Sequence, residues 1–451
     1  MKIYKHIARN IHFPITQLIK GEKVGKYLNQ LEESQYFSKE QLEDLQIQKL
    51  QNLLVYVNEN SLYYKNLFEK ESINPKEITT FQQFQKIPFL TKEIITTQQN
   101  NLTTQNYQGK IYQCTTSGST GKTLNFTVTS EYSSWDWASR WRARRWFDVN
   151  IGDKEMAIWG RPVYNKLSRF FDPVKAIFRN TILLDGFDVS EENLEKYSRI
   201  LFRYKPEYIY GYSNSVFQLA KHIYDFHHQK TIPTIKAIFV TAEMLYPDQR
   251  DIVEKVFNAP VSNEYGCSEV GGFAFECKEG NWHISSENVI VESISIDENP
   301  PEFVLTSLTN FHMPFIRYRI GDLGELSNDK CTCEVNLPIL KFNAGKTTDV
   351  IRLKNGRKLT SEIFLYLTRA MVENKLQPLK NFKIIQKEFD LFTILHENEI
   401  NSESKKQFTQ LFLNLLKEND IIIQFQQVEK LEKDKTGKFR YYISELKNEI
   451  I

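Results

Sequence analysis

Residues 115–122 combine five hydroxyl side chains, two glycines and a lysine in eight consecutive positions. Glycines let a backbone turn tightly and point N–H groups at an anion, and hydroxyls and a lysine add the donors that a polyphosphate needs. The stretch departs from the P-loop pattern, which requires glycine where this chain has Thr116. Taken alone, it fits an ordinary surface loop slightly better, so its interpretation depends on the motifs that follow.

Four more motifs follow it along the chain, and each of them is weak when taken alone. They are Asn-Glu-Tyr-Gly-Cys-Ser-Glu at 263–269, Arg-Tyr-Arg-Ile-Gly-Asp-Leu-Gly at 317–324, Gly-Lys-Thr-Thr-Asp-Val-Ile at 345–351 and Asp-Lys-Thr-Gly-Lys-Phe-Arg at 434–440. In this order and at these separations, the set resembles the adenylate-forming superfamily of acyl-CoA synthetases, luciferases and peptide-synthetase adenylation domains. The phenylacetate–CoA ligase-like branch, including relatives from capsular-polysaccharide gene clusters, is the most similar.

The resemblance covers nearly the whole chain and implies its architecture. It implies an α/β fold with a large N-terminal adenylation domain, built from parallel-sheet subdomains and a β-rich part, and a small mobile α+β domain at the C-terminus. We expect the ATP- and acid-binding domain at residues 1–346 and the swivelling domain at residues 347–451.

The family also implies a role for each matching residue in the chemistry of acid activation. A carboxylate that attacks the α-phosphorus of ATP gives an acyl-adenylate and pyrophosphate, and positioning and charge stabilisation carry most of that catalysis. The implied nucleotide-binding residues are Thr116, Ser117, Gly118, Ser119, Thr120, Gly121, Lys122, Glu243, Tyr265, Gly266, Ser268, Asp322 and Lys346. Within this set, Asp322 would bind the ribose hydroxyls, and Glu269 would help to bind Mg²⁺ through a hard carboxylate oxygen.

Lys438 is the implied catalytic lysine, carried by the C-terminal domain to the carboxylate and the α-phosphate during adenylation. The family then rotates that domain about a few linker residues, and Thr348 or Asp349 is the candidate pivot. One departure concerns Lys346, where the family usually has an arginine that contacts ribose. Lysine keeps the positive charge but lacks the planar guanidinium fork, so we expect the ribose contact to be weaker or to come from another residue.

A second group of residues has the composition of a zinc site. Cys277, His283, Cys331 and Cys333 supply three sulfurs and one imidazole, which is a set that zinc binds as a closed tetrahedron. Members of the branch carry similar cysteine pairs, some of them with a structural metal. We therefore expect structural zinc, and the alternative is buried free cysteines beside an incidental histidine.

Together these features predict an ATP- and Mg²⁺-dependent ligase that activates a carboxylic acid and passes it to coenzyme A or to an amine. Its pocket would be lined from residues 159–161, 210–213, 241–243 and 263–265. The alternatives are an AMP transferase that acts on a phosphate-bearing acceptor, or a non-enzymatic binding protein of polysaccharide assembly. The acid, the acceptor and the oligomeric state stay open.

Composition narrows the partners and the compartment. The net charge of +2 gives no electrostatic case for nucleic acid, so we interpret the Trp- and Arg-rich helix at 132–147 as amphipathic with a buried aromatic side. No apolar run reaches the ~20 residues of a membrane span, and the basic N-terminus lacks a signal-peptide core. We expect a cytoplasmic protein without a transmembrane segment, whose first helix is a solvated face rather than a membrane contact.

The elements that must position these residues follow from hydrophobic periodicity. Residues 1–75 have a mostly helical pattern. Short apolar runs at 156–159, 208–210 and 237–240 alternate with helical segments at 191–204 and 215–228, which indicates a largely parallel sheet. Residues 289–318 are rich in β-type residues. A smaller unit of alternating strands and helices follows residue 345.

Overall fold

The computed structural model describes residues 2–116, 124–159, 178–186, 189–242, 245–295, 301–341, 350–355, 358–360, 382–416, 418–431 and 442–446. The chain divides into two compact units. The first consists of Met1–Glu292, Val304–Arg319 and Leu326–Leu340, and the second of Ser293–Phe303, Ile320–Glu325 and Lys341–Ile451. The expected domain boundary between residues 346 and 347 lies outside the described residues and stays a prediction.

The N-terminal part of the first unit is helical, as the sequence predicts. Its elements are α1 (Lys2–Ile7), the π-helix η1 (Ala8–His12), α2 (Phe13–Lys20), α3 (Val24–Ser34), α4 (Lys39–Asn60), α5 (Leu62–Lys70), the 3-10 helix η2 (Pro75–Glu77), α6 (Phe81–Phe84) and α7 (Lys92–Leu102). The longest of them, α4, begins at a capping box in which Ser38 accepts from the Gln41 N–H. Its buried leucines are Leu42, Leu50, Leu53 and Leu54, which lie at helical spacing.

A nine-stranded sheet forms the centre of the first unit, with the order β13-β14-β9-β8-β7-β6-β5-β3-β4. Its strands are β3 (Glu155–Trp159), β4 (Thr181–Asp185), β5 (Tyr208–Tyr212), β6 (Ala237–Thr241), β7 (Val261–Cys267), β8 (Gly271–Glu276), β9 (Trp282–Ile284), β13 (Glu325–Ser327) and β14 (Ile339–Lys341). Strands β4, β3, β5, β6 and β7 run parallel, and β8, β9 and β14 continue the sheet with antiparallel pairs.

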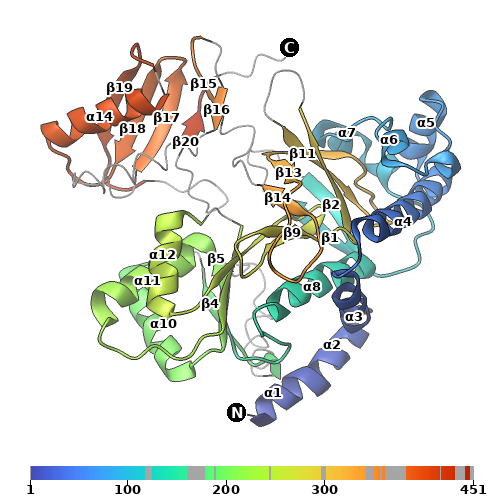
Figure 1. Cartoon of the computed structure of the whole chain (residues 1–451), viewed down its shortest axis with the longest axis horizontal. Helices are drawn as coiled ribbons and strands as arrows, with labels where there is room; N and C mark the ends of the chain where they lie inside the picture. The colour runs from blue at the N-terminus through green and yellow to red at the C-terminus, as the bar shows by residue number, and fades with distance from the viewer. Residues whose placement is uncertain are drawn as a thin grey trace. The chain divides into compact units, whose positions relative to one another are not determined.

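Three helices cover the parallel strands: α10 (Glu191–Tyr204), α11 (Ser213–His227) and α12 (Pro247–Phe257) (Figure 1). They alternate with the strands along the chain, which is the arrangement that parallel pairing requires. Apolar residues of the strands and helices, such as Ile209, Leu219 and Val240, form one buried core. The α/β class predicted from the alternation is therefore confirmed.

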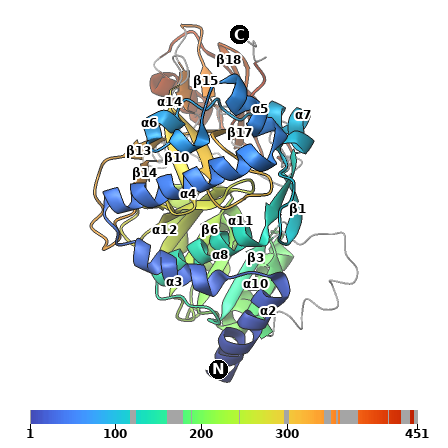
Figure 2. The ribbon, with the colours of Figure 1, turned by 90° about the vertical axis from the view of Figure 1, so that its right-hand side faces the viewer.

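Helix α8 (Ser130–Arg145) follows directly on a hairpin of β1 (Ile111–Thr116) and β2 (Leu124–Thr129). Figure 2 shows α8 with α3 and α4 in the view from the side. The hairpin strands pair antiparallel up to Thr116 opposite Leu124, so residues 117–123 connect their ends. A three-stranded sheet has the order β10-β11-β12, formed by β10 (Val289–Ile294), β11 (Glu302–Ser307) and β12 (Tyr318–Leu323).

The second unit has its own sheet and its own core. Its strands β17 (Phe382–Glu388), β18 (Leu391–His396), β19 (Ile422–Gln427) and β20 (Tyr442–Ser444) form a sheet of order β19-β18-β17-β20. Strands β15 (Val350–Arg352) and β16 (Lys358–Thr360) pair separately, and α14 (Ser402–Leu416) contributes Phe408 and Phe412 to the core. Across the described parts of the chain, every helix is too short or too polar to cross a lipid bilayer.

Candidate active site

The order of the parallel strands reverses its direction at one point of the sheet. The chain leaves β3 toward β4 on one side, and it leaves β5 toward β6 on the other side. Neighbouring strands whose connections depart in opposite directions mark a topological switch point, where open α/β sheets bind their ligands. The carboxyl ends of β3 and β5 are therefore the place to look for a substrate site.

Aromatic side chains lie at this switch point. Trp159 ends β3, and its ring stacks on Tyr212 at 4.4 Å between centroids and on Tyr210 at 5.2 Å. Thr241 ends β6 in register with Tyr212, and its hydroxyl donates to the Glu264 carbonyl of β7 at 2.8 Å. Residues from all four segments predicted to line the acid pocket thus lie near the carboxyl ends of neighbouring strands. Their aromatic wall suits an acid with an apolar face.

The turn from β7 to β8 carries the Tyr-Gly-x-Ser-Glu motif. Gly266 lies where a Cβ atom would come within 2.3 Å of the Gly271 carbonyl oxygen, so no larger residue fits there. The pairing of β7 with β8 also shifts its register between Tyr265 and Gly266. The Tyr265 ring packs edge-on against Phe273 with 4.7 Å between centroids. The motif therefore forms a tight, irregular turn at the carboxyl end of β7.

Glu269, the predicted magnesium ligand, is held by a phenol. Its carboxylate accepts a 3.0 Å hydrogen bond at Oε1 from the hydroxyl of Tyr318, and both side chains are buried. Among the described residues none donates to the other carboxylate oxygen, Oε2. An oriented carboxylate with one oxygen left over has the chemistry that a hard cation such as Mg²⁺ takes as a ligand.

One face of α8 holds this turn in place, and sequence reasoning missed it. Tyr132, Asp136, Arg140 and Arg144 recur every fourth residue, so they line up along the helix. The Tyr132 hydroxyl donates to the Ser268 carbonyl at 2.9 Å, and Asp136 accepts from the Gly272 N–H at 2.7 Å. The fourfold spacing of polar side chains in residues 132–144 was the signal that could have found it.

The same face neutralises a buried carboxylate at the end of β7. Arg140 Nη1 donates to Glu264 Oε2 at 2.5 Å, and Arg144 Nε lies 3.7 Å from Glu264 Oε1. Burial and the charge of Glu264 raise the pKa of Tyr210, which accepts from Arg140 at 3.3 Å. The phenol therefore stays neutral, and the two arginines are balanced by the carboxylates of Glu264 and Asp136.

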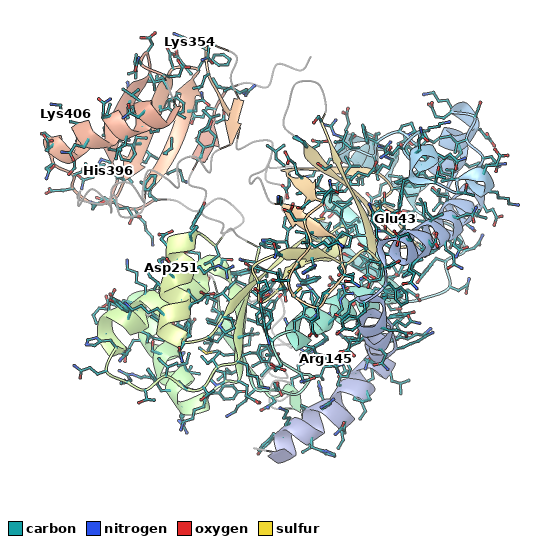
Figure 3. All side chains as sticks on the ribbon, viewed as in Figure 1. Glu43, Arg145, Asp251, Lys354, His396 and Lys406 are labelled. Atoms are coloured by element: carbon teal, nitrogen blue, oxygen red, sulfur yellow. The ribbon has the colours of Figure 1, made fainter. Side chains whose placement is uncertain are left out.

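The interpretation of the aromatic side of this helix was wrong in part. Trp135 is buried, but Trp137 is 37% exposed, whereas Arg142 and Arg144 are 1% exposed. Arg142 donates to Glu287 at 2.6 Å and to Ser285 at 2.8 Å, so its charge is paired inside the protein. Arg145 lies at the end of the helix (Figure 3) and pairs with Glu32 of α3 at 2.6 Å. These arginines serve packing between elements.

In the motif at residues 317–324, Arg317 has a structural role and Asp322 is the predicted ribose ligand. Arg317 has a left-handed backbone conformation with φ +50°. Its guanidinium donates to both oxygens of Glu292, at 2.9 and 3.0 Å, and to the carbonyls of Gln85 and Ile87. It therefore anchors the segment before α7. Asp322, the predicted ribose ligand, lies half-buried on β12.

The predicted zinc ligands lie together at the end of the sheet. One ligand atom each from Cys277, His283, Cys331 and Cys333 lies within 4.8 Å of all the others. The sulfurs of Cys277 and Cys331 are 3.6 Å apart, and His283 Nε2 lies 3.1 Å from the sulfur of Cys333. Tetrahedral zinc, with bonds of about 2.0–2.3 Å, places its ligand atoms about 3.5–4 Å apart. The three sulfurs and one imidazole suit the ion; the Cys277–Cys331 spacing fits this geometry, and His283 and Cys333 lie slightly closer together than it requires.

The surroundings of the cluster favour the protonation states of His283 and Cys331 that bind a metal. His283 Nδ1 faces the Leu337 carbonyl at 2.9 Å, so the proton belongs on Nδ1 and the Nε2 lone pair points at the cluster. Burial lowers the pKa of His283, which keeps the imidazole neutral. Burial opposes the thiolate of Cys331, but hydrogen bonds from Cys333, Asn281 and Cys277 outweigh it and lower the pKa of that thiol.

A second cluster, Glu195, His222 and His227, also brings its ligand atoms within 4.8 Å. Both histidines share one oxygen of Glu195, at 3.2 and 2.6 Å, and Arg199 donates to the other at 2.8 Å. These bonds join α10 to α11 and satisfy the carboxylate. We assign the group to helix packing.

Other predicted site residues lie outside the described part of the chain. They are Ser117, Gly118, Ser119, Thr120, Gly121, Lys122, Glu243, Lys346 and Lys438, together with the candidate pivots Thr348 and Asp349 and the side chain of Thr116. Their roles remain predictions.

Comparison with known proteins bears on the fold of the chain. No protein-family model matches the chain. It is 30% identical over 289 residues to protein CapK of Staphylococcus aureus, and the match spans 63% of this chain and 63% of the length of that relative. Among solved structures, 2-hydroxyisobutyryl-CoA ligase in the postadenylation state, in complex with R3-HIB-AMP, matches with a TM-score of 0.71 and 15% identity over 90% of each chain.

A second solved structure extends the comparison. ATP-bound MatB from Rhodopseudomonas palustris matches with a TM-score of 0.50 and 12% identity, over 73% of this chain and 66% of that one. The chain therefore has the fold of the AMP-forming acyl-CoA ligases, as its resemblance to the adenylate-forming superfamily predicts.

Proposed function

We propose that this protein is an adenylate-forming enzyme that activates a carboxylic acid with ATP and Mg²⁺ and transfers the acyl group to coenzyme A or to an amine. The observation that carries the proposal is the position of residues Tyr265–Glu269, with Gly266 and Glu269 fixed, at the carboxyl end of β7 in the sheet that contains the topological switch point. The fold match over 90% of the chain to a ligase in complex with an adenylate supports it.

In the proposed reaction, a carboxylate oxygen of the substrate attacks the α-phosphorus of ATP, and pyrophosphate leaves. The thiol of coenzyme A, or an amine, then attacks the acyl carbon and displaces AMP. The acid would lie against Trp159 and Tyr212, with its carboxylate toward the turn that follows Tyr265. Because Arg140 and Glu264 pair with each other, they would position this turn rather than exchange protons with the substrate.

Bound Mg²⁺ would neutralise phosphate charge, and Glu269 is the described residue that would hold it. Tyr318 orients that carboxylate. Lys438 would contribute positive charge at the reacting carboxylate and α-phosphate, and Asp322 would accept hydrogen bonds from the ribose. We also propose that Cys277, His283, Cys331 and Cys333 bind structural zinc, on the strength of their distances and of the neutral His283.

The direct test is pyrophosphate release by the full chain with ATP and Mg²⁺ across a panel of aromatic, branched and 2-hydroxy acids, with and without coenzyme A. We expect one class of acid to stimulate release, and multiple turnovers to need a thiol or amine acceptor. ATP binding without stimulation by any acid would overturn acid activation and favour AMP transfer to a phosphate-bearing acceptor. Failure to bind ATP would favour a non-enzymatic role.

A further inference from the structure

The first helical segment of the chain exposes a stripe of large apolar side chains that the proposed reaction does not use. Ile11, Ile15, Leu18 and Ile19 are 49%, 51%, 82% and 68% exposed. Their spacing of four, three and four residues, counted from Ile11 to Ile15 and from Ile15 to Leu18 and Ile19, places them on one face of a helix. None of the eight residues of α2 is buried.

The opposite side of this segment is fixed to the protein, so the stripe faces outward. Ala8 is buried, and a Cβ atom on Gly152 would come within 2.8 Å of the Lys5 carbonyl, so the backbones are in close contact. Lys5 forms ion pairs with Asp153 and Glu207. Phe13, two residues before Ile15 and thus across the helix from it, packs on the core that contains Trp135.

The charge of the segment selects its partner. Residues 2–21 contain Lys2, Lys5, Arg9 and Lys20 but no aspartate or glutamate. Lys5 is engaged within the protein, and Lys20 lies 3.7 Å from Glu22 but keeps 42% of its side chain exposed, whereas Arg9 is exposed. A second copy of the chain would bring two such cationic segments together, which like-charge repulsion disfavours. Anionic lipid headgroups complement the charge and accept apolar side chains beneath them.

Further apolar side chains lie beside the stripe. Phe178, 49% exposed, stacks on His12 with 6.4 Å between ring centroids. Lys110 donates to the carbonyl of Ile19, and Ile111 next to it is 40% exposed. The exposed apolar surface therefore continues from α2 onto its neighbours.

We propose that residues 2–20 bind the surface of an anionic lipid bilayer, with Ile11, Ile15, Leu18 and Ile19 inserted between the headgroups. The solvated helix face expected from the sequence is thereby replaced by an interfacial helix that lies in the plane of the membrane surface. This inference is independent of the proposed reaction, because it uses none of the residues of the active site.

The test is co-sedimentation of the full chain with vesicles of phosphatidylcholine alone and of equal parts phosphatidylcholine and phosphatidylglycerol. Wild type should bind the anionic vesicles, and Leu18→Gln/Ile19→Gln should bind about tenfold more weakly or worse. The control Leu62→Gln/Ile422→Gln alters two exposed apolar side chains outside the stripe, 51% and 57% exposed, and should bind like wild type. Arg9→Gln/Lys20→Gln should weaken binding to the anionic vesicles only.

Thermal unfolding of each variant checks that it is folded, which we expect because the altered side chains are exposed. Wild type that ignores both kinds of vesicle would overturn the proposal, as would equal binding by the stripe variant and the control. Light scattering tests the alternative, in which a second copy of the chain binds the stripe. If the wild type is a dimer and Leu18→Gln/Ile19→Gln a monomer, with no vesicle binding by either, the stripe is a contact between copies of the chain.

Discussion

Lys49 of α4 is a single residue whose buried charge lowers the stability of the folded state at neutral pH. Its ammonium group donates to the Glu287 carbonyl at 2.7 Å and lies 3.8 Å above the Trp135 ring. Burial lowers the pKa of Lys49 to about 8, although the charges of Glu287 and Glu131 act in the opposite direction. The unfolded chain therefore binds more protons than the folded chain between about pH 8 and pH 10.5.

The sign of this difference gives a testable prediction. Stability should rise with pH across that window, because the folded state no longer has to hold a charged lysine. We expect the free energy of unfolding of wild type, relative to Lys49→Met, to increase by about 1–2 kcal/mol from pH 7 to pH 10, a value reduced for the partial solvent contact of the side chain. Urea titrations at both pH values measure it, and a difference independent of pH would contradict the account.

The sequence predicted some single residues of the site and missed the burial of others. Tyr265, Gly266 and Glu269 were identified from a contiguous motif, and the structure places Tyr265 and Gly266 at the end of β7 and Glu269 in the turn that follows. The burial of Arg142 and Arg144 was missed because their partners, Glu287 and Glu264, lie more than a hundred residues away. A local pattern of aromatic residues and arginines carries no information about such distant acceptors.

At the scale of elements, hydrophobic periodicity predicted individual helices and strands but not which of them lie next to one another. Residues 191–204 form α10 with the expected bounds, because local hydrophobic spacing sets them. The position of β3 between β4 and β5 depends on packing across the whole sheet. The topological switch point, which follows from this order, could be identified only from the three-dimensional structure.

The metal cluster is a property of several elements, and its test belongs at this scale. Cys277 follows β8, His283 lies on β9, and Cys331 and Cys333 precede β14, which pairs with β9. A bound ion would tie the ends of these strands together. We expect Cys331→Ser to lower the zinc content and to reduce the melting temperature by several degrees, measured by elemental analysis and calorimetry.

Cys114→Ser provides the matched control, because Cys114 is the cysteine of β1 and lies outside the cluster. Its zinc content should equal that of wild type. Wild-type protein that purifies without metal and takes up none on addition of zinc would refute the assignment. Unchanged metal content in Cys331→Ser would refute it as well.

At the scale of the whole molecule, the chain has two units that each bury their own core. The proposed reaction assigns roles to residues of both units: Glu269 belongs to the first unit, and Asp322 and Lys438 belong to the second. The proposal therefore predicts that a single lysine far along the chain controls chemistry on an acid that the first unit binds.

The most direct measurement of this claim is acid-dependent exchange of labelled pyrophosphate into ATP, with the best acid of the panel. Wild type should catalyse the exchange, and Lys438→Ala should lose it by about a hundredfold or more while still binding ATP. Lys435→Ala, three residues earlier in the same segment, is the control and should keep the activity. Exchange by Lys438→Ala at the rate of wild type would contradict the account.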